Sequence, residues 1–310
     1  MKAHRRILAL LLVTLASGAR AQQEPDLDYQ PPLPQPAYAP GAGPRVAIDE
    51  AHHNYHTAGG RYAPFAALLR RDGYRVDGLG QPFSPETLHG LAVLVIANPL
   101  HPRNVKDWSL PTPSAFTAAE IAAVRDWVDA GGALFLIVDH LPFPGAAGDL
   151  ARAFGIEFSN GFAVAKRAGQ PTTFVFPLGK GLAPGAITQG RNDRERVTQV
   201  LTFVGSAFKA PRDAVPVLQL NNDFVSLKPT TAWKFTASTP REPLDGWCQG
   251  AVMDFGRGRI AVFGEAAMFS AQLAGPGHEK VGMNAPEASQ NHQLLLNVLH
   301  WLTRVPGMPD

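Results

Sequence analysis

The sequence predicts an α/β protein with a mostly parallel sheet, helices on both faces of that sheet, and extra β-strands in the C-terminal half. Two observations predict this class. In the first half, short runs of consecutive apolar residues alternate with amphipathic segments, as they do when parallel strands are covered by helices on both faces. In the second half, strand-like runs follow one another with few helices between them. The 310 residues are enough for one large core.

The strands of the first half are expected at 45–49, 74–77, 92–97 and 133–138, the last two being continuous apolar runs. Helices are expected between them. One carries Phe65, Leu68 and Leu69 on a single face and ends at Gly73. Another begins at Ser84-Pro85, with proline at the first helical position. A third opens with the capping box Thr117-x-x-Glu120, and a fourth covers 145–154.

The second half is expected to be richer in strands. Runs at 172–176, 196–203 and 215–220 have strand character, and 249–255 and 259–263 form a hairpin around Gly256-Arg257-Gly258. Residues 274–288 are rich in loop-forming residues, and 289–303 form a last amphipathic helix. Chain order leaves open whether these strands extend the main sheet or form a separate layer.

The N-terminus has the pattern of a secretory signal peptide. Lys2, Arg5 and Arg6 precede an apolar run, and Ala19-Arg20-Ala21 is a cleavage site of the A-x-A kind. We therefore expect residues 1–21 to be removed and the mature protein to be periplasmic or secreted. Residues 22–44 hold seven prolines between Pro25 and Pro44 and are expected to be an extended linker. The folded domain is then 45–304, followed by a short tail, 305–310.

Composition excludes several classes of protein. With 45% hydrophobic and 17% charged residues, the chain is not mainly disordered. Cleavage would remove four basic residues and no acidic one, leaving 24 against 26, so no basic surface argues for nucleic acid. Cys248 is the single cysteine, so no internal disulfide forms. No apolar run in the mature chain is long enough for a transmembrane helix.

Polar residues gather where the expected strands end. The first strand leads into Asp49-Glu50-Ala51-His52-His53 and on to His56; the third into Asn98, the fourth into Asp139-His140, and a late strand into Glu265. Ligands of open parallel sheets bind outside the carboxyl ends of the strands. We therefore expect a polar cleft there, with Asp49, His53, Asn98 and Asn284 as ligand-binding residues.

Imidazole and carboxylate together suit zinc or another divalent metal ion. His52, His56, His140 and Asp139 are the candidate metal ligands. A bound metal could activate water for hydrolysis of a small or carbohydrate-like substrate. His140, Glu50, Asp139 and Glu265 are the candidate catalytic residues that would move the proton. The loop tryptophan Trp108 could stack on a sugar, although such residues more often serve as packing anchors.

Two alternatives stay open at this point. The same polar groups can hold one another and cap helices, as Asp and His at strand ends commonly do. The protein can also be a non-catalytic ligand-binding or scaffold module of the cell envelope, in which case the proline-rich segment would tether it near an envelope protein partner. The chain contains neither H-E-x-x-H nor G-x-S-x-G, which argues against a metalloprotease helix and an α/β-hydrolase.

Four segments carry a family resemblance: AIDEAHHNYHT, LVIANP, the Glu120-to-Trp127 helix with GGALFLIVDH, and GRGRIAVFGEAAMFS. Over 45–304 the chain resembles a bacterial branch of the class I glutamine amidotransferase-like superfamily. Related branches are the ThuA-like proteins of sugar metabolism and a domain of gliding-motility and intraflagellar-transport proteins. The resemblance implies a flavodoxin-like three-layer α/β/α core and a nucleophile elbow at Val138-Asp139-His140.

The resemblance also limits the chemistry. Active amidotransferases carry a cysteine at that elbow, and this chain has none there, so glutamine hydrolysis through a thioester is excluded. The ThuA-like branch often has a histidine near the turn, which His140 matches.

Overall fold

The computed structural model describes residues 23–167 and 173–310, so the predicted signal peptide lies outside the described residues. The helices are α1 (Ala63–Arg71), α2 (Pro85–Leu88), α3 (Ala118–Asp129), α4 (Phe143–Arg152), α5 (Ala186–Gln189) and α6 (Asn291–Leu302). The strands are β1 (Gln23–Pro25), β2 (Arg45–Asp49), β3 (Arg75–Leu79), β4 (Val93–Ala97), β5 (Ala133–Ile137), β6 (Glu157–Phe158), β7 (Phe162–Ala165), β8 (Phe174–Pro177), β9 (Gln199–Thr202), β10 (Phe208–Lys209), β11 (Val215–Gln219), β12 (Phe224–Leu227), β13 (Arg241–Pro243), β14 (Cys248–Phe255), β15 (Gly258–Phe263), β16 (Ala271–Ala274) and β17 (Glu279–Gly282).

The main sheet has nine strands and is mixed. Five neighbours, β3-β2-β4-β5-β15, are parallel, and their chain order is the 2-1-3-4-5 order of flavodoxin-like sheets. Beyond β15 the strands β14, β10 and β6 continue the sheet antiparallel, and β11 pairs with β14. The expectation of a mostly parallel sheet therefore holds for these five strands, and the additional C-terminal strands of the sheet are antiparallel. The tight β14–β15 turn reverses the chain, and a hairpin can join only antiparallel strands.

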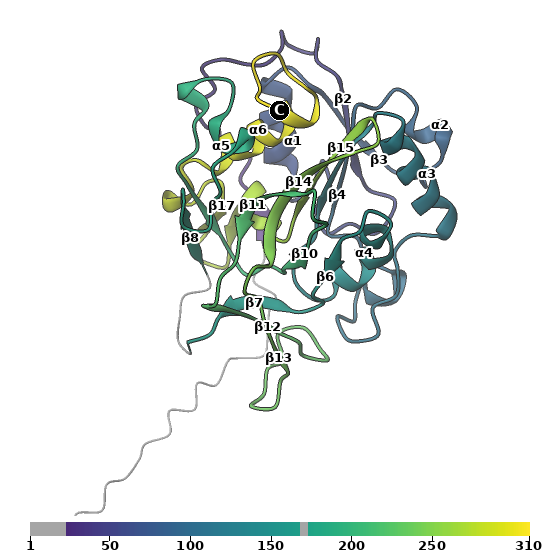
Figure 1. Cartoon of the computed structure of the whole chain (residues 1–310), viewed down its shortest axis with the longest axis vertical. Helices are drawn as coiled ribbons and strands as arrows, with labels where there is room; N and C mark the ends of the chain where they lie inside the picture. The colour runs from purple at the N-terminus through teal and green to yellow at the C-terminus, as the bar shows by residue number, and fades with distance from the viewer. Residues whose placement is uncertain (1–22, 168–172) are drawn as a thin grey trace, which may run out of the picture.

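Helices cover both faces of the parallel half. Side chains of β5 alternate between two cores: Phe135 and Ile137 pack in one, and Leu134 and Leu136 in the other. The first core includes residues of α1, α5 and α6, and the second includes residues of α2, α3 and α4. Figure 1 shows these two groups of helices on opposite sides of the sheet. This alternation explains why the strand sequences are apolar throughout.

The sequence predicted most elements of the first half. The helix over Phe65, Leu68 and Leu69 is α1, and the Thr117-x-x-Glu120 capping box opens α3 with both of its hydrogen bonds present. The hairpin expected at 249–263 is β14–β15. The loop-rich assignment of 274–288 is wrong in part, because β16 and β17 form a hairpin that pairs with β1.

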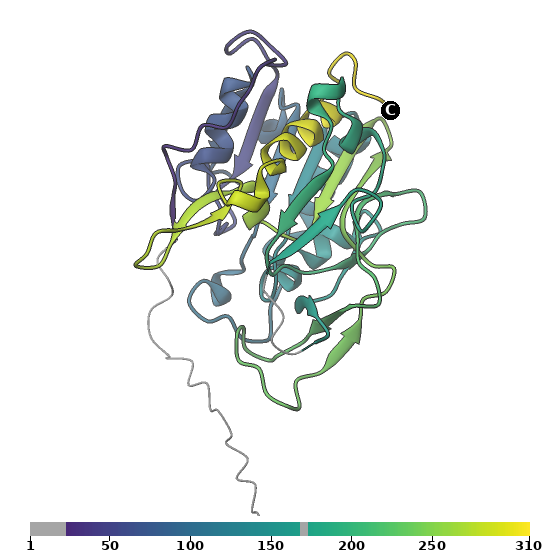
Figure 2. The same cartoon turned by 90° about the vertical axis from the view of Figure 1, so that its left-hand side faces the viewer.

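The remaining strands form small separate sheets. β8 pairs with β9, and β13-β12-β7 make a three-stranded sheet. Figures 1 and 2 both place the β12–β13 region at the lower end of the molecule, away from the helices that cover the main sheet. The second half thus both extends the main sheet and builds additional layers.

Residues 26–44, here called the N-terminal strap, are not a loose linker. Tyr29, Leu33 and Tyr38 pack against the core, and the Tyr38 ring meets Tyr74 edge-on at 5.1 Å. The backbone of the strap is hydrogen-bonded to the end of α1, with Gly43 N donating to Gly73 O at 2.9 Å. The expectation of an extended linker at 22–44 is corrected: prolines restrict the unfolded chain, so this segment loses little conformational entropy when apolar side chains between them pack.

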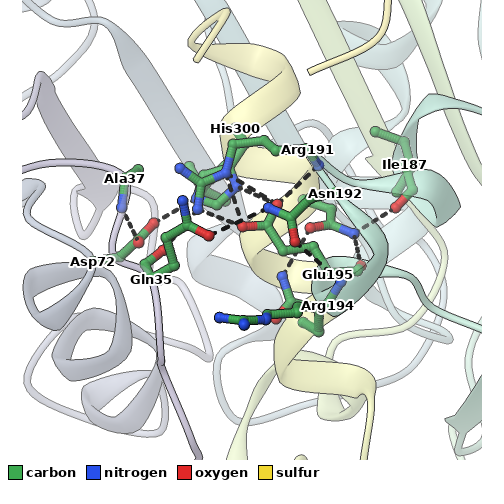
Figure 3. A network of polar contacts seen from close by, with 12 residues as sticks. Gln35, Ala37, Asp72, Ile187, Arg191, Asn192, Arg194, Glu195 and His300 are labelled. Atoms are coloured by element: carbon green, nitrogen blue, oxygen red, sulfur yellow. Dashed lines mark hydrogen bonds and ion pairs between the residues drawn. The ribbon is translucent and has the colours of Figure 1, made fainter. Parts of the chain in front are cut away.

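A buried polar network fastens the strap to α1 and α6 (Figure 3). His300 of α6 contacts Asp72 through Nε2 at 2.7 Å, and Ala37 N donates to the other Asp72 oxygen at 2.7 Å. Arg191 pairs with Glu195 and donates to Gln35 O at 2.7 Å. Because Asp72 and His300 are almost fully buried, losing one partner would leave an unpaired buried polar group.

The C-terminal residues also belong to the domain. Val305 is buried, and the Asp310 carboxylate accepts a hydrogen bond from Arg259 at 3.0 Å. Within 23–167 and 173–310, none of the helices has both the length and the apolar character needed to cross a bilayer.

Candidate functional site

A cleft of about 600 Å³ lies over the carboxyl ends of β2, β5 and β15. This is the edge of an open α/β sheet at which ligands bind. The segments after these strands supply its polar groups, while the loops before β10 and β13 and the β16–β17 hairpin supply much of the rest. The residues that line it are Gln23, Tyr55, His56, Trp108, Asp139, His140, Phe143, Phe203, Val204, Ala232, Trp233, Glu265, Ala267, Gln272 and Val281.

Two carboxyl groups lie side by side in the sheet order, because β5 and β15 are parallel neighbours and Asp139 and Glu265 follow them. Glu265 is fully buried and accepts hydrogen bonds from Ala267 N at 2.7 Å and Met268 N at 2.8 Å. Burial, and then the charge of Asp139, raise the pKa of Glu265 to about 8. Burial likewise raises the pKa of Asp139 to about 7, opposed by hydrogen bonds from His140 N and Asn98. The pair can therefore hold and release a proton near neutral pH.

The two histidines of the cleft are held neutral. Burial lowers the pKa of His140 to about 4, and burial with the nearby Arg61 lowers that of His56 to about 3. His140 Nδ1 lies 2.8 Å from Leu141 O, so Nδ1 carries the proton and Nε2 is an acceptor. A neutral imidazole with so low a pKa is a weak base, which makes the carboxyl pair the better proton acceptor.

Asn98 organises the floor of the cleft. Its side chain takes a hydrogen bond from Asp139 N at 2.7 Å, and its Nδ2 lies 3.2 Å from His56 Nδ1. The donation to His56 Nδ1 leaves the ring proton on Nε2. Asn98 is buried and has a φ of 56°, a conformation that asparagine tolerates better than most residues. It therefore positions two residues of the cleft rather than binding a ligand itself.

Aromatic rings form the walls. Trp108 and Phe143 meet edge-on at 5.2 Å, and Tyr55 packs against both. On the other side, Trp233 stands edge-on to His140 at 4.7 Å while remaining 53% exposed. Trp233 has a φ of 65°, which is unusual for a bulky residue and is the kind of outlier that accompanies ligand sites.

His52, expected to bind metal, lies outside the cleft. Its Nδ1 contacts Asp49 at 2.9 Å and its Nε2 contacts Glu120 at 2.8 Å, while its ring packs between Phe83 and Phe116. Burial works against a charged ring, but Asp49 and then Glu120 outweigh it and raise the pKa of His52. Burial raises the pKa of Asp49, and His52 opposes that shift. This Asp49–His52–Glu120 triad links the end of β2 to the start of α3.

Three further candidates are also away from the cleft. Glu50 is exposed and accepts a hydrogen bond from Ala58 N at 2.9 Å. His53 is exposed as well. Asn284 donates to Asp26 at 2.9 Å and so fastens the strap. The expectation that these residues and Asp49 line the cleft is wrong. Asp49, Glu50 and Asn284 hydrogen-bond to other segments, and His53 is exposed.

The predicted metal site is not assembled. Of its four candidate ligands, His56, His140 and Asp139 line the cleft, but His52 is held by the triad. Within the described part of the chain, no group of three or more His, Cys, Asp or Glu side chains is placed to hold a metal ion. The described residues of the cleft therefore do not fit a metal centre.

Sequence reasoning missed Trp233 and Gln272. Trp233 lies in the aromatic run Ala232-Trp233-Lys234-Phe235, whose concentration of aromatic residues in a polar loop was the available signal. No sequence signal marks Gln272, because its segment has no recognisable strand pattern. Only the pairing of β1 with β16 brings this residue to the cleft.

The structural comparisons support the fold. The mmIFT52 N-terminal domain matches with a TM-score of 0.58 at 17% identity, over 83% of this chain and 97% of that one. Cytoplasmic protein STM1381 from Salmonella typhimurium LT2 matches with a TM-score of 0.50 at 14% identity, over 83% and 98%. A ThuA-like protein from Bacteroides uniformis ATCC 8492 has a TM-score of 0.47 at 12% identity, over 93% and 94%. No protein-family model and no curated protein match the sequence. The first two structures show that the α/β fold is shared.

Proposed function

We propose that this protein binds a small, carbohydrate-like molecule in the cleft and hydrolyses it with the Asp139–Glu265 pair. The observation that carries the proposal is a pair of carboxyl groups, Glu265 fully buried and Asp139 half-buried, with pKa values raised to about 8 and 7, in an aromatic-walled cleft of about 600 Å³. A cleft of this size suits a small molecule. Flat aromatic side chains beside a few polar groups suit a ring that has an apolar face and hydroxyl groups.

The environments of the two carboxyl groups assign their roles in this proposal. Glu265 is fully buried and lies beside the charge of Asp139, so it keeps the proton of the pair and acts as general acid. Asp139 is half-buried and accepts a hydrogen bond from His140 N at 2.8 Å, so it is ionised and acts as general base toward water. Two acidic residues in these roles are the usual means of hydrolysing a glycosidic bond. By the resemblance, the turn Val138-Asp139-His140 corresponds to the one at which amidotransferase-like enzymes carry their cysteine, and the reaction proposed here uses no thiol. In this proposal the protein belongs to the ThuA-like side of that superfamily.

The pair predicts a bell-shaped pH profile for kcat/KM. The rate should rise as pH passes about 7 and Asp139 ionises, and fall as pH passes about 8 and Glu265 loses its proton. Asp139→Asn and Glu265→Gln should each lower kcat about 10²-fold or more and remove one limb of the profile. Release of nitrophenol from a panel of nitrophenyl glycosides measures this.

The control is Glu279→Gln, which removes an exposed carboxylate from β17 outside the lining of the cleft. It should leave the pH profile unchanged. A profile that is flat from pH 6 to 9 in the wild type, with hydrolysis present, would contradict the assigned roles.

A second candidate is ligand binding without turnover, in an envelope scaffold. It is favoured by the absence of a serine, threonine or cysteine nucleophile among the described residues that line the cleft. Calorimetry separates the two: sugar binding without release of nitrophenol from any glycoside supports the binding module. In that case Trp233→Ala should weaken binding by about 1 kcal/mol, the usual contribution of an aromatic contact.

The proposal includes export of the protein from the cytoplasm. The n-region, apolar run and A-x-A site support secretion into the periplasm or medium. Mass spectrometry of the exported protein should find Gln22 as the first residue. Full-length protein retained in the cytoplasm would contradict it.

A further inference from the structure

The ionisable side chains that could carry charge in the cleft are acidic. Of the described residues that line it, Asp139 and Glu265 are acidic and none is lysine or arginine. Arg61, which contacts the lining residue Tyr55, is itself absent from the lining; its guanidinium lies over the Tyr55 ring at 3.8 Å and donates to Tyr55 O. His56 and His140 are neutral, because burial lowers the pKa of both. An acidic or phosphorylated ligand would therefore meet repulsion and no compensating cation.

Gln272, which lines the cleft, has an unpaired buried acceptor. Gln272 is 1% exposed, and its Nε2 donates to Ser270 Oγ at 2.6 Å. Its Oε1 has no hydrogen-bond partner within 23–167 and 173–310. An unsatisfied buried acceptor is unfavourable, so a donor supplied by the ligand would stabilise the complex.

The one charge among the polar groups of the lining near neutral pH is the negative charge of Asp139, since Glu265 keeps its proton. Gln272 Oε1 and His140 Nε2 are further acceptors, whereas His56 Nε2 is a donor. The walls add the faces of Tyr55, Trp108 and Trp233, and aromatic faces attract cations. A ligand that matches the Asp139 charge and these faces is positively charged.

We propose that the ligand of this cleft is an amino sugar, whose protonated amine is bound between the Asp139 carboxylate and Gln272. This inference rests on the proposed function and specifies its substrate class. The ammonium group supplies three donors and pairs with the Asp139 charge, and the sugar ring lies against the aromatic walls. Neutral sugars keep the ring contact but lose the charge-assisted hydrogen bonds.

Matched pairs of sugars test the inference by isothermal titration calorimetry. D-glucosamine differs from D-glucose, and 1-amino-1-deoxy-D-sorbitol from D-sorbitol, only by an amine in place of a hydroxyl. Each amine should bind about tenfold more tightly than its partner, the difference between a charged and a neutral hydrogen bond. D-glucuronate, an acidic sugar of the same ring size, should bind more weakly than D-glucose.

Three variants locate the preference. The ratio of amine to hydroxyl affinity should fall to within about twofold in Asp139→Asn and in Gln272→Leu, and stay unchanged in Glu279→Gln, which alters only an exposed carboxylate. Equal affinities in the wild type, tighter glucuronate binding, or a ratio that survives Asp139→Asn would overturn the amino-sugar assignment while leaving sugar binding intact. Absence of binding by all five sugars would overturn the proposed function together with it.

Discussion

Replacing His52 with alanine should lower the free energy of unfolding by about 3–5 kcal/mol, the loss expected when one partner of a buried ion pair is removed. The ring of His52 is 6% exposed and holds Asp49 on one nitrogen and Glu120 on the other. The variant would leave both carboxylates without their partner and a void between Phe83 and Phe116. Urea denaturation at constant pH measures the change.

The neighbouring His53→Ala is the matched control. His53 is exposed, so its replacement should change the free energy of unfolding by no more than about 0.5 kcal/mol. Equal losses in the two variants would show that the triad contributes nothing specific.

The same triad predicts a dependence of stability on pH. The pKa of His52 is raised above its ordinary 6.5, so the stabilisation from its charge is fully present below pH 6.5 and is lost as pH rises through the raised value. The raised pKa of Asp49 also makes the protein less stable as pH rises, and this loss begins above the ordinary Asp pKa of 3.8. Wild-type protein should therefore lose stability on the alkaline side of pH 6.5, and His52→Ala should lack that part of the curve. Parallel curves for both proteins would refute it.

A chain that begins at Arg45 should be less stable by at least about 3 kcal/mol, or fail to fold, since three apolar side chains of the strap leave the core. Tyr29, Leu33 and Tyr38 pack there, and Ala37 N pairs with the buried Asp72. The deletion also removes β1, which pairs with β16 beside the cleft. Thermal and urea denaturation of the deletion variant measure the loss.

Leu27→Ala provides the control within the same segment. Leu27 is 72% exposed, so its replacement should change stability by no more than about 0.5 kcal/mol. A deletion variant as stable as the full chain would mean that residues 23–44 act as a linker after all.

Local signals in the sequence predicted the first half of the fold well. The Thr117-x-x-Glu120 capping box and the apolar runs of β4 and β5 each determine their own structure within a few residues. The antiparallel half of the sheet depends on pairing between distant segments, such as β10 with β6 and β14. Short strands such as Phe208–Lys209 carry no periodicity that could be recognised in advance.

The sequence could place only those site residues that directly follow a strand. Asp139, His140 and Glu265 reached the cleft because parallel strands end at one edge of the sheet. The histidines in the loop after β2 could not be placed in the same way. His56 lines the cleft, whereas His52 contacts Glu120 of α3. Glu120 was predicted only as the capping-box residue of α3, but it also accepts a hydrogen bond from His52. Nothing in the sequence spacing indicates this second partner.

The location of the single thiol has a consequence for how the protein responds to oxidants. Cys248 lies in β14, is 5% exposed and does not line the cleft, and burial raises its pKa to about 11. At pH 7 only about one molecule in ten thousand would carry the reactive thiolate. Peroxide and alkylating reagents should therefore leave the cleft untouched, and the protein would work without a supply of reductant.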